Sequence, residues 1–125
     1  MRTFLVVAAL LVGLPMSSHA AQPAANSART PAAEIDALID RVAHAKGVVF
    51  IRNGSDYTAT EAAAHLQRKR EAAGDKVRTP EQFIDALGSR SSMSGKAYRV
   101  RLADGREMDS AVWLKGLLHD LRTGR

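Results

Sequence analysis

Three side chains that can move protons or bind metals recur every four residues in the middle of the chain: Glu61, His65 and Lys69. In a helix, residues four apart lie on one face, so these groups would form a stripe. Such a stripe fits a proton-transfer pair or two metal ligands, although an exposed face of stabilising charge pairs is the commoner arrangement. The stripe lacks the HExxH order of zinc peptidases. We therefore expect a polar face with no metal, no cofactor and no enzymatic activity.

A second group of polar residues lies in the stretch SRSSMSGKA, residues 89–97, whose serines and glycine predict a surface loop. The segment SGKAY at residues 94–98 fits the pattern SGxxY. A serine hydroxyl and a lysine ammonium on such a loop can form charge-assisted hydrogen bonds with the carboxylates of a partner. Gly95 would let the backbone approach that partner closely, and Tyr98 would anchor the loop in the core.

The SGxxY pattern is similar to the inhibitory loop of periplasmic lysozyme inhibitors, which are β-rich proteins. In that class the loop enters the catalytic cleft of the lysozyme, where two carboxyl groups catalyse cleavage of the polysaccharide. The resemblance implies partner contacts by the loop, with two following arginines adding electrostatic steering. The expected partner-binding residues are Ser92, Ser94, Gly95, Lys96, Tyr98, Arg99 and Arg101. The alternative is a plain Ser/Gly connector whose tyrosine is a core residue.

The segment Arg52-Asn53-Gly54 with Asp56 is a third polar group. Asn-Gly pairs favour turns that require positive φ angles. We therefore expect this segment to have a structural role and not to form a binding site.

The first 20 residues have the three parts of a cleavable signal peptide. Arg2 supplies positive charge, residues 4–14 form an apolar run, and Ser18 and Ala20 are the small residues before the cut. The apolar run is too short to span a membrane. We expect export to the periplasm, with no stable membrane insertion after cleavage.

The amino-acid composition excludes some kinds of chemistry and makes some kinds of binding partner unexpected. The chain has no cysteine, which excludes thiol chemistry and cysteine-ligated zinc. The net charge is +5, but the positive residues are dispersed and are not interleaved with aromatic residues, so nucleic acid is not an expected partner. In the periplasm, the expected anionic partners are acidic proteins, lipid headgroups and cell-wall polymers.

Hydrophobic periodicity and capping residues predict a single α+β domain at residues 30–125, preceded by a flexible tether at residues 21–29. About four helices would pack on a small antiparallel sheet of two to three strands. The expected helices are 31–46, 59–73, a short one after Thr79, and a last one after Asp109; the expected strands are 48–51 and 98–102.

Four stretches of the chain together resemble a known family. They are FIRNG at 50–54, YTATEAAAHLQRK at 57–69, TPEQFIDALGSRSSMSGKAY at 79–98 and WLKGLL at 113–118. With them the chain resembles the bacterial periplasmic domain-of-unknown-function family 5329, which includes YfeK-like proteins. The resemblance implies a small secreted domain with no assigned activity. One departure is Ala97, where the motif is expected to have proline.

These observations favour a small periplasmic protein-binding module. Its most specific form is an inhibitor or immunity protein that blocks a lysozyme-like peptidoglycan hydrolase through the Ser94–Tyr98 loop. The alternative is a non-catalytic envelope component that binds peptidoglycan, anionic lipid or an envelope assembly.

Overall fold

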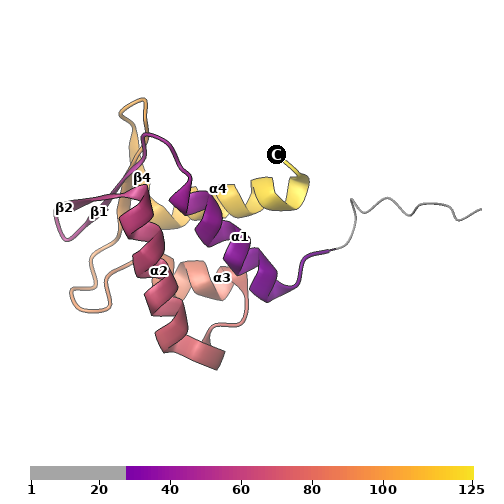
Figure 1. Ribbon diagram of the computed structural model, residues 1–125. Coiled ribbons are helices and arrows are strands. Elements are labelled where there is room, and N and C mark those ends of the chain that lie inside the picture. The colour runs from indigo at the N-terminus through magenta and orange to yellow at the C-terminus, as the bar shows by residue number, and fades with distance from the viewer. Residues whose placement is uncertain (1–27) are drawn as a thin grey trace, which may run out of the picture.

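A computed structural model describes residues 28–125 of the chain (Figure 1). The predicted signal peptide at 1–20 and most of the predicted tether at 21–29 lie outside these residues. Within residues 28–125, no helix is both long and apolar enough to cross a membrane.

The described chain has four α-helices: α1 (Pro31–Ala43), α2 (Ala59–Ala73), α3 (Pro80–Phe83) and α4 (Ser110–Thr123). A 3-10 turn, Gly74–Lys76, follows α2, and α3 continues as a π-helical segment, Ile84–Gly88. The first three helices begin at threonine caps: Thr30, Thr58 and Thr79 each accept a backbone N–H of the first turn.

The strands form one antiparallel sheet in the order β2-β1-β3-β4. Their bounds are β1 Val49–Arg52, β2 Ser55–Thr58, β3 Arg99–Arg101 and β4 Glu107–Asp109. The central strands β1 and β3, which cover most of the two expected apolar strands, pair antiparallel and align Phe50 with Val100. The α+β class is confirmed.

The prediction of two to three strands was wrong, because the sheet has four. The two missed strands, β2 and β4, are the short edge strands of the sheet, and most of their residues are exposed. Edge strands of this kind bury few apolar side chains, so their sequences, SDYT and EMD, lack the alternation that predicts a strand.

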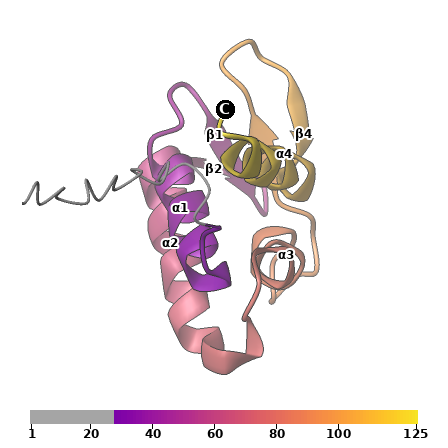
Figure 2. The same cartoon turned by 90° about the vertical axis from the view of Figure 1, so that its right-hand side faces the viewer.

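The helices pack on one face of the sheet and leave the other face to solvent (Figure 2). Phe50 and Val100 point toward the helices and are buried, and the Phe50 ring meets Trp113 edge-on at 5.3 Å between centroids. Phe83, the largest fully buried side chain, joins the same core from α3. Alternation along the strands therefore divides the sheet into a core face and an outer face.

Two predicted helix ends differ from the structure. The first helix ends at Ala43 and not at Lys46, because His44 caps it through its backbone N–H to Asp40 and the following residues form a turn. Asp109 precedes α4 as predicted, but its side chain forms no capping hydrogen bond. Its carboxylate binds Arg99 on the outer face instead.

The end of the π-helical segment brings the chain close to α4. A Cβ on Gly88 would lie 2.7 Å from Cδ1 of Leu114, closer than real atoms approach. A side chain at this position would require the Leu114 side chain to shift, and the chain then leaves the core toward residues 89–97.

Candidate functional site

Residues 89–97 form a surface loop, as predicted, and its base is closed by main-chain hydrogen bonds. The Ser91 N–H donates to the Lys96 carbonyl at 2.9 Å, and the Tyr98 N–H donates to the Ser89 carbonyl at 2.9 Å. The Gly95 N–H donates to the Ser91 carbonyl, also at 2.9 Å. The conformation of the 89–97 loop is therefore fixed largely by its own backbone.

The Asn53 side chain braces this loop from the β1–β2 turn. Its Nδ2 donates to the Ser91 hydroxyl at 3.4 Å, and its Oδ1 accepts the Ser94 hydroxyl at 2.5 Å. Asn53 and Gly54 have φ angles of 51° and 79°, as the predicted turn requires. Because the Ser94 hydroxyl already donates its hydrogen bond to Asn53, hydrogen bonds donated to a partner would come from other loop residues.

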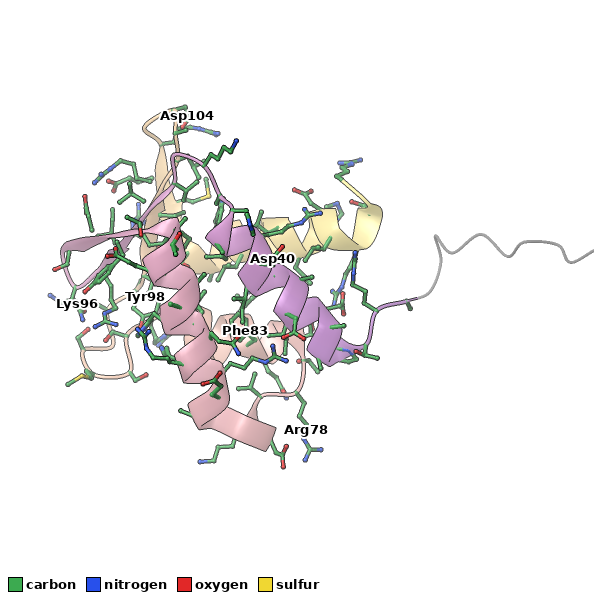
Figure 3. The ribbon with its side chains drawn as sticks, in the orientation of Figure 1. Asp40, Arg78, Phe83, Lys96, Tyr98 and Asp104 are labelled. Atoms are coloured by element: carbon green, nitrogen blue, oxygen red, sulfur yellow. The ribbon has the colours of Figure 1, made fainter. Side chains whose placement is uncertain are left out.

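The tip of the loop presents one apolar and one cationic side chain to solvent. Met93 is 97% exposed, and Ser92, Gly95 and Lys96 are also exposed. Lys96 has no ion pair within residues 28–125 and points away from the body of the domain (Figure 3). A protruding methionine beside an unpaired ammonium is suited to contact with a protein.

The two predicted steering arginines lie on the outer face of β3, where carboxylates neutralise them. Arg99 binds Asp109 at 2.8 Å. Arg101 lies between Glu107 at 3.1 Å and Asp56 at 3.4 Å. Their charge is largely balanced locally, whereas Lys96 and the exposed Arg90 of the loop have no ion pair within residues 28–125.

The stripe of Glu61, His65 and Lys69 lies along α2, but its members have different neighbours. Glu61 completes a capping box: its Oε2 accepts the Thr58 N–H at 2.8 Å while its own N–H donates to the Thr58 hydroxyl. It forms no hydrogen bond with His65. Across residues 28–125, no three His, Cys, Asp or Glu side chains gather closely enough to hold a metal ion.

Tyr98 joins the two groups of residues that the sequence singles out separately. Its ring is buried at the root of the loop, with 7% of the residue exposed. Lys69 Nζ donates to the Tyr98 hydroxyl at 3.1 Å and to the Leu87 carbonyl at 3.0 Å. The same hydroxyl lies 3.5 Å from Nε2 of His65. The loop and the α2 stripe are thus parts of one region.

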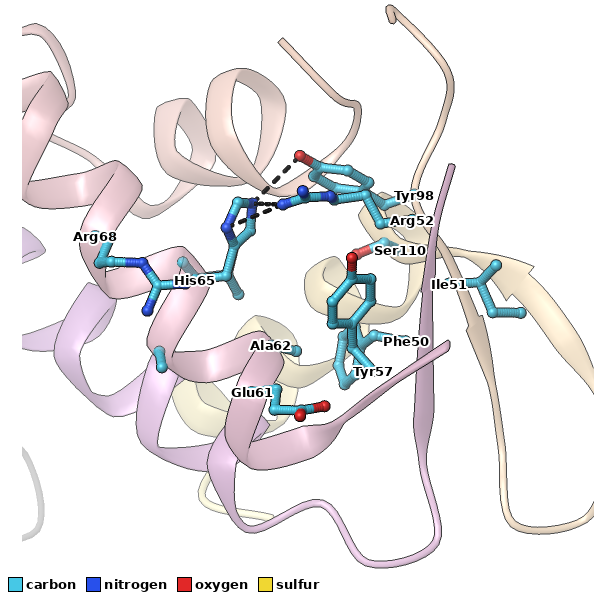
Figure 4. A pocket seen from close by; sticks show the side chains of 12 residues that line it. Phe50, Ile51, Arg52, Tyr57, Glu61, Ala62, His65, Arg68, Tyr98 and Ser110 are labelled. Carbon is cyan, nitrogen blue, oxygen red and sulfur yellow. Dashed lines mark hydrogen bonds between the residues drawn. The ribbon is translucent and has the colours of Figure 1, made fainter. Parts of the chain in front are cut away.

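A pocket of about 330 Å³ opens between α2 and the β1–β2 hairpin in this region (Figure 4). Phe50, Tyr57 and Tyr98 supply aromatic walls. Polar groups come from five further residues: Arg52, Glu61, His65, Arg68 and Ser110. Nη1 of Arg52 lies 3.1 and 3.2 Å from the two ring nitrogens of His65, and its guanidinium lies 5.4 Å from the Tyr57 ring centroid.

The sequence interpretation missed Arg52, Tyr57 and Arg68 as members of a site. It assigned the segment that contains Arg52 to a turn alone. Strand alternation carries the missing signal, because Arg52 is two residues after buried Phe50 and therefore points to the same face of the sheet. Arg68 lies one helical turn after His65.

The pKa of His65 is held below its ordinary value of 6.5. Burial of the ring is the main cause, and repulsion by Arg52, Lys69 and Arg68 adds to it. Unfolding relieves both effects, so the unfolded chain binds the proton more readily. We expect stability to be full above about pH 6.5 and to fall as the pH drops through the lowered folded-state pKa.

Urea unfolding at about pH 7.5 and about pH 5 tests this dependence. The His65→Gln variant should lose less stability between the two values than the wild type. His119→Gln, at an exposed position of α4, should retain the wild-type difference. An unchanged difference in His65→Gln would show that this imidazole does not contribute.

Replacing Asn53 by glycine should loosen the 89–97 loop without straining the turn. Glycine keeps the positive φ but removes both hydrogen bonds to Ser91 and Ser94. We expect a loss of about 1–2 kcal/mol in the free energy of unfolding. Amide hydrogen exchange should also become faster across residues 91–96. Exchange as slow as in the wild type would contradict the brace.

The fold and the site define this chain as a small α+β domain with a braced loop beside a cationic, aromatic-walled pocket. The chain belongs to the Family of unknown function (DUF5329), whose model matches residues 29–122. The resemblance to that family is thus confirmed.

A curated relative is similar to part of the chain. It is the Uncharacterized protein YfeK of Salmonella typhimurium (strain LT2), which is 39% identical over 66 residues. The alignment covers 53% of this chain and 55% of the relative, so it spans about half the length of each. No solved structure matches the chain. The likeness of the loop to lysozyme inhibitors stays a prediction.

Proposed function

We propose that this protein is a periplasmic protein-binding module that inhibits a lysozyme-like peptidoglycan hydrolase by inserting the 89–97 loop into its catalytic cleft. The observation that supports this most strongly is the combination of a braced loop and an exposed tip. Asn53 and the loop backbone hold the segment in one shape, while Met93 and Lys96 face solvent.

Fixing the loop before binding lowers the entropic cost of association. In the complex, the Lys96 ammonium would pair with the carboxylates of a muramidase cleft by charge-assisted hydrogen bonds. Met93 would pack on an apolar part of the cleft, where its flexible thioether adapts to irregular surfaces. Ser94 would act by maintaining the shape of the loop through Asn53.

The predicted export of the protein supports the choice of partner. The leader predicted at residues 1–20 would place the protein in the periplasm, where peptidoglycan hydrolases act. The small domain, without a clustered metal site in residues 28–125, acts in this proposal through its surface and not through chemistry.

The test is a titration of residues 21–125 into c-type, g-type and phage-type lysozymes, and into any muramidase encoded beside the gene. Loss of wall-lysing activity in proportion to added protein supports the proposal. A Met93→Ala, Lys96→Ala double variant should lose this effect, whereas a Val112→Ala variant, changed at an exposed apolar residue of α4, should retain it. Full activity of every enzyme, or equal inhibition by the double variant, would reject it.

The net charge of +5 favours a second candidate, an envelope component that binds peptidoglycan or anionic lipid. Such a protein would sediment with isolated peptidoglycan or with anionic vesicles, and added salt would release it. Sedimentation without inhibition of any hydrolase would favour this function over the first.

A further inference from the structure

We propose that the pocket between α2 and the β1–β2 hairpin binds a small organic anion: a carboxylate or phosphate group attached to a flat apolar body. This site is separate from the exposed tip of the loop, and the proposal does not depend on the identity of any protein partner.

Positive charge gathers in the pocket without an acidic partner. Arg52, Arg68 and Lys69 surround His65, and none of the three cations forms an ion pair within residues 28–125. Glu61 is the only carboxylate among the lining residues, and the start of α2 engages it. Other arginines of the domain, such as Arg99 and Arg122, do have carboxylate partners. The pocket therefore attracts anions.

Arg52 is positioned to hold such an anion. Its Nη1 contacts the imidazole of His65, and its guanidinium lies beside the Tyr57 ring, so the group is held in place by uncharged neighbours. Its Nε and Nη2 make no hydrogen bond within residues 28–125. These two donors form a planar fork that matches the oxygens of a carboxylate or a phosphate.

The aromatic walls of the pocket indicate what kind of group the rest of the ligand would be. Phe50, Tyr57 and Tyr98 line the cavity with aromatic surface, and Figure 4 shows the Tyr57 and Tyr98 rings on the same side of α2 as Arg52. A volume of about 330 Å³ is within the range of small-molecule sites. An aromatic or similarly flat body can pack against these rings while its anionic group reaches Arg52.

The test uses benzoate and phenyl phosphate as probes, with benzyl alcohol as the neutral control of similar size. Each is titrated into ¹⁵N-labelled protein from residue 21 onward, and amide chemical shifts are followed. We expect saturable shifts around Tyr57 and Ala64 with at least one anion. Benzyl alcohol should bind at least about tenfold more weakly. Tighter binding of benzoate would identify a carboxylate site, and tighter binding of phenyl phosphate a phosphate site.

Two variants and a control locate the interaction. Arg52→Gln should weaken binding of the preferred anion by at least about tenfold, and Arg68→Gln, at an exposed position on the rim, should weaken it without risk to folding. Arg106→Gln removes an equal charge in the distant β3–β4 turn and should leave affinity unchanged. The proposal is overturned if neither anion gives saturable shifts, if benzyl alcohol binds as tightly, or if both pocket variants bind as the wild type does.

Discussion

Replacing Lys96 by glutamate should abolish inhibition of the target hydrolase, with the dissociation constant rising at least about a hundredfold. In the proposed complex this ammonium faces carboxylates of the cleft, so the variant replaces attraction by repulsion between like charges. Lys96 is exposed and has no ion pair within residues 28–125. The free energy of unfolding should therefore change little.

Lys46→Glu is the matched control, because it makes the same charge change at another exposed lysine. Lys46 lies just before the start of β1. The loop that carries Lys96 contacts Asn53, just after the end of β1, so the two lysines lie near opposite ends of this strand. The control should inhibit as the wild type does. Equal weakening by both variants would mean that net charge, and not the loop, governs binding.

Phe83→Ala should be the most destabilising substitution considered, with a loss of about 3–5 kcal/mol. The ring is 0% exposed, and it packs with residues of α1 and α4 in the core. Truncation removes the apolar area and leaves a cavity that the surrounding helices fill only partly. Against a typical domain stability of roughly 5–15 kcal/mol, this is a large fraction.

Urea unfolding followed by tryptophan fluorescence measures this loss, because Trp113 is the only tryptophan and lies against the Phe50 ring in the same core. Phe83→Leu preserves most of the volume and should lose less than about half as much stability. A loss below about 1 kcal/mol in Phe83→Ala would show that α3 is not part of the cooperative core.

Local signals explain where the sequence predicts the fold well. The bounds of α2 follow from Thr58 and Glu61 at capping-box spacing and from Gly74 at the other end, and all of these contacts lie within one helix. The two central strands were predictable as elements because Phe50 and Val100 each lie in an apolar segment, whereas their antiparallel pairing was not. Helices and strands that place apolar side chains in the core can be recognised from the hydrophobic pattern of a single sequence.

Long-range contacts explain what the sequence could not predict. Asn53 braces Ser91 and Ser94 across 38 and 41 residues, and nothing near Asn53 in the chain signals those partners. The pocket likewise requires Arg52 of β1 to meet His65 of α2. Both parts of the candidate site depend on how the β1–β2 hairpin lies against the rest of the fold.

The loop and the pocket share Tyr98, so contacts that hold this side chain in place stabilise both. The Tyr98 ring fixes the root of the loop and forms one wall of the pocket, and Lys69 holds its hydroxyl. Occupation of the pocket by an anion would stabilise the same residues that position the loop.

Amide hydrogen exchange in the presence of each lysozyme is the most direct test of the loop as the partner-binding element. We expect the enzyme that is inhibited to slow exchange in residues 91–97 of this protein, with little change on the outer face of β3 and β4. Slowed exchange elsewhere with an unaltered loop, or no slowing with any hydrolase, would contradict it.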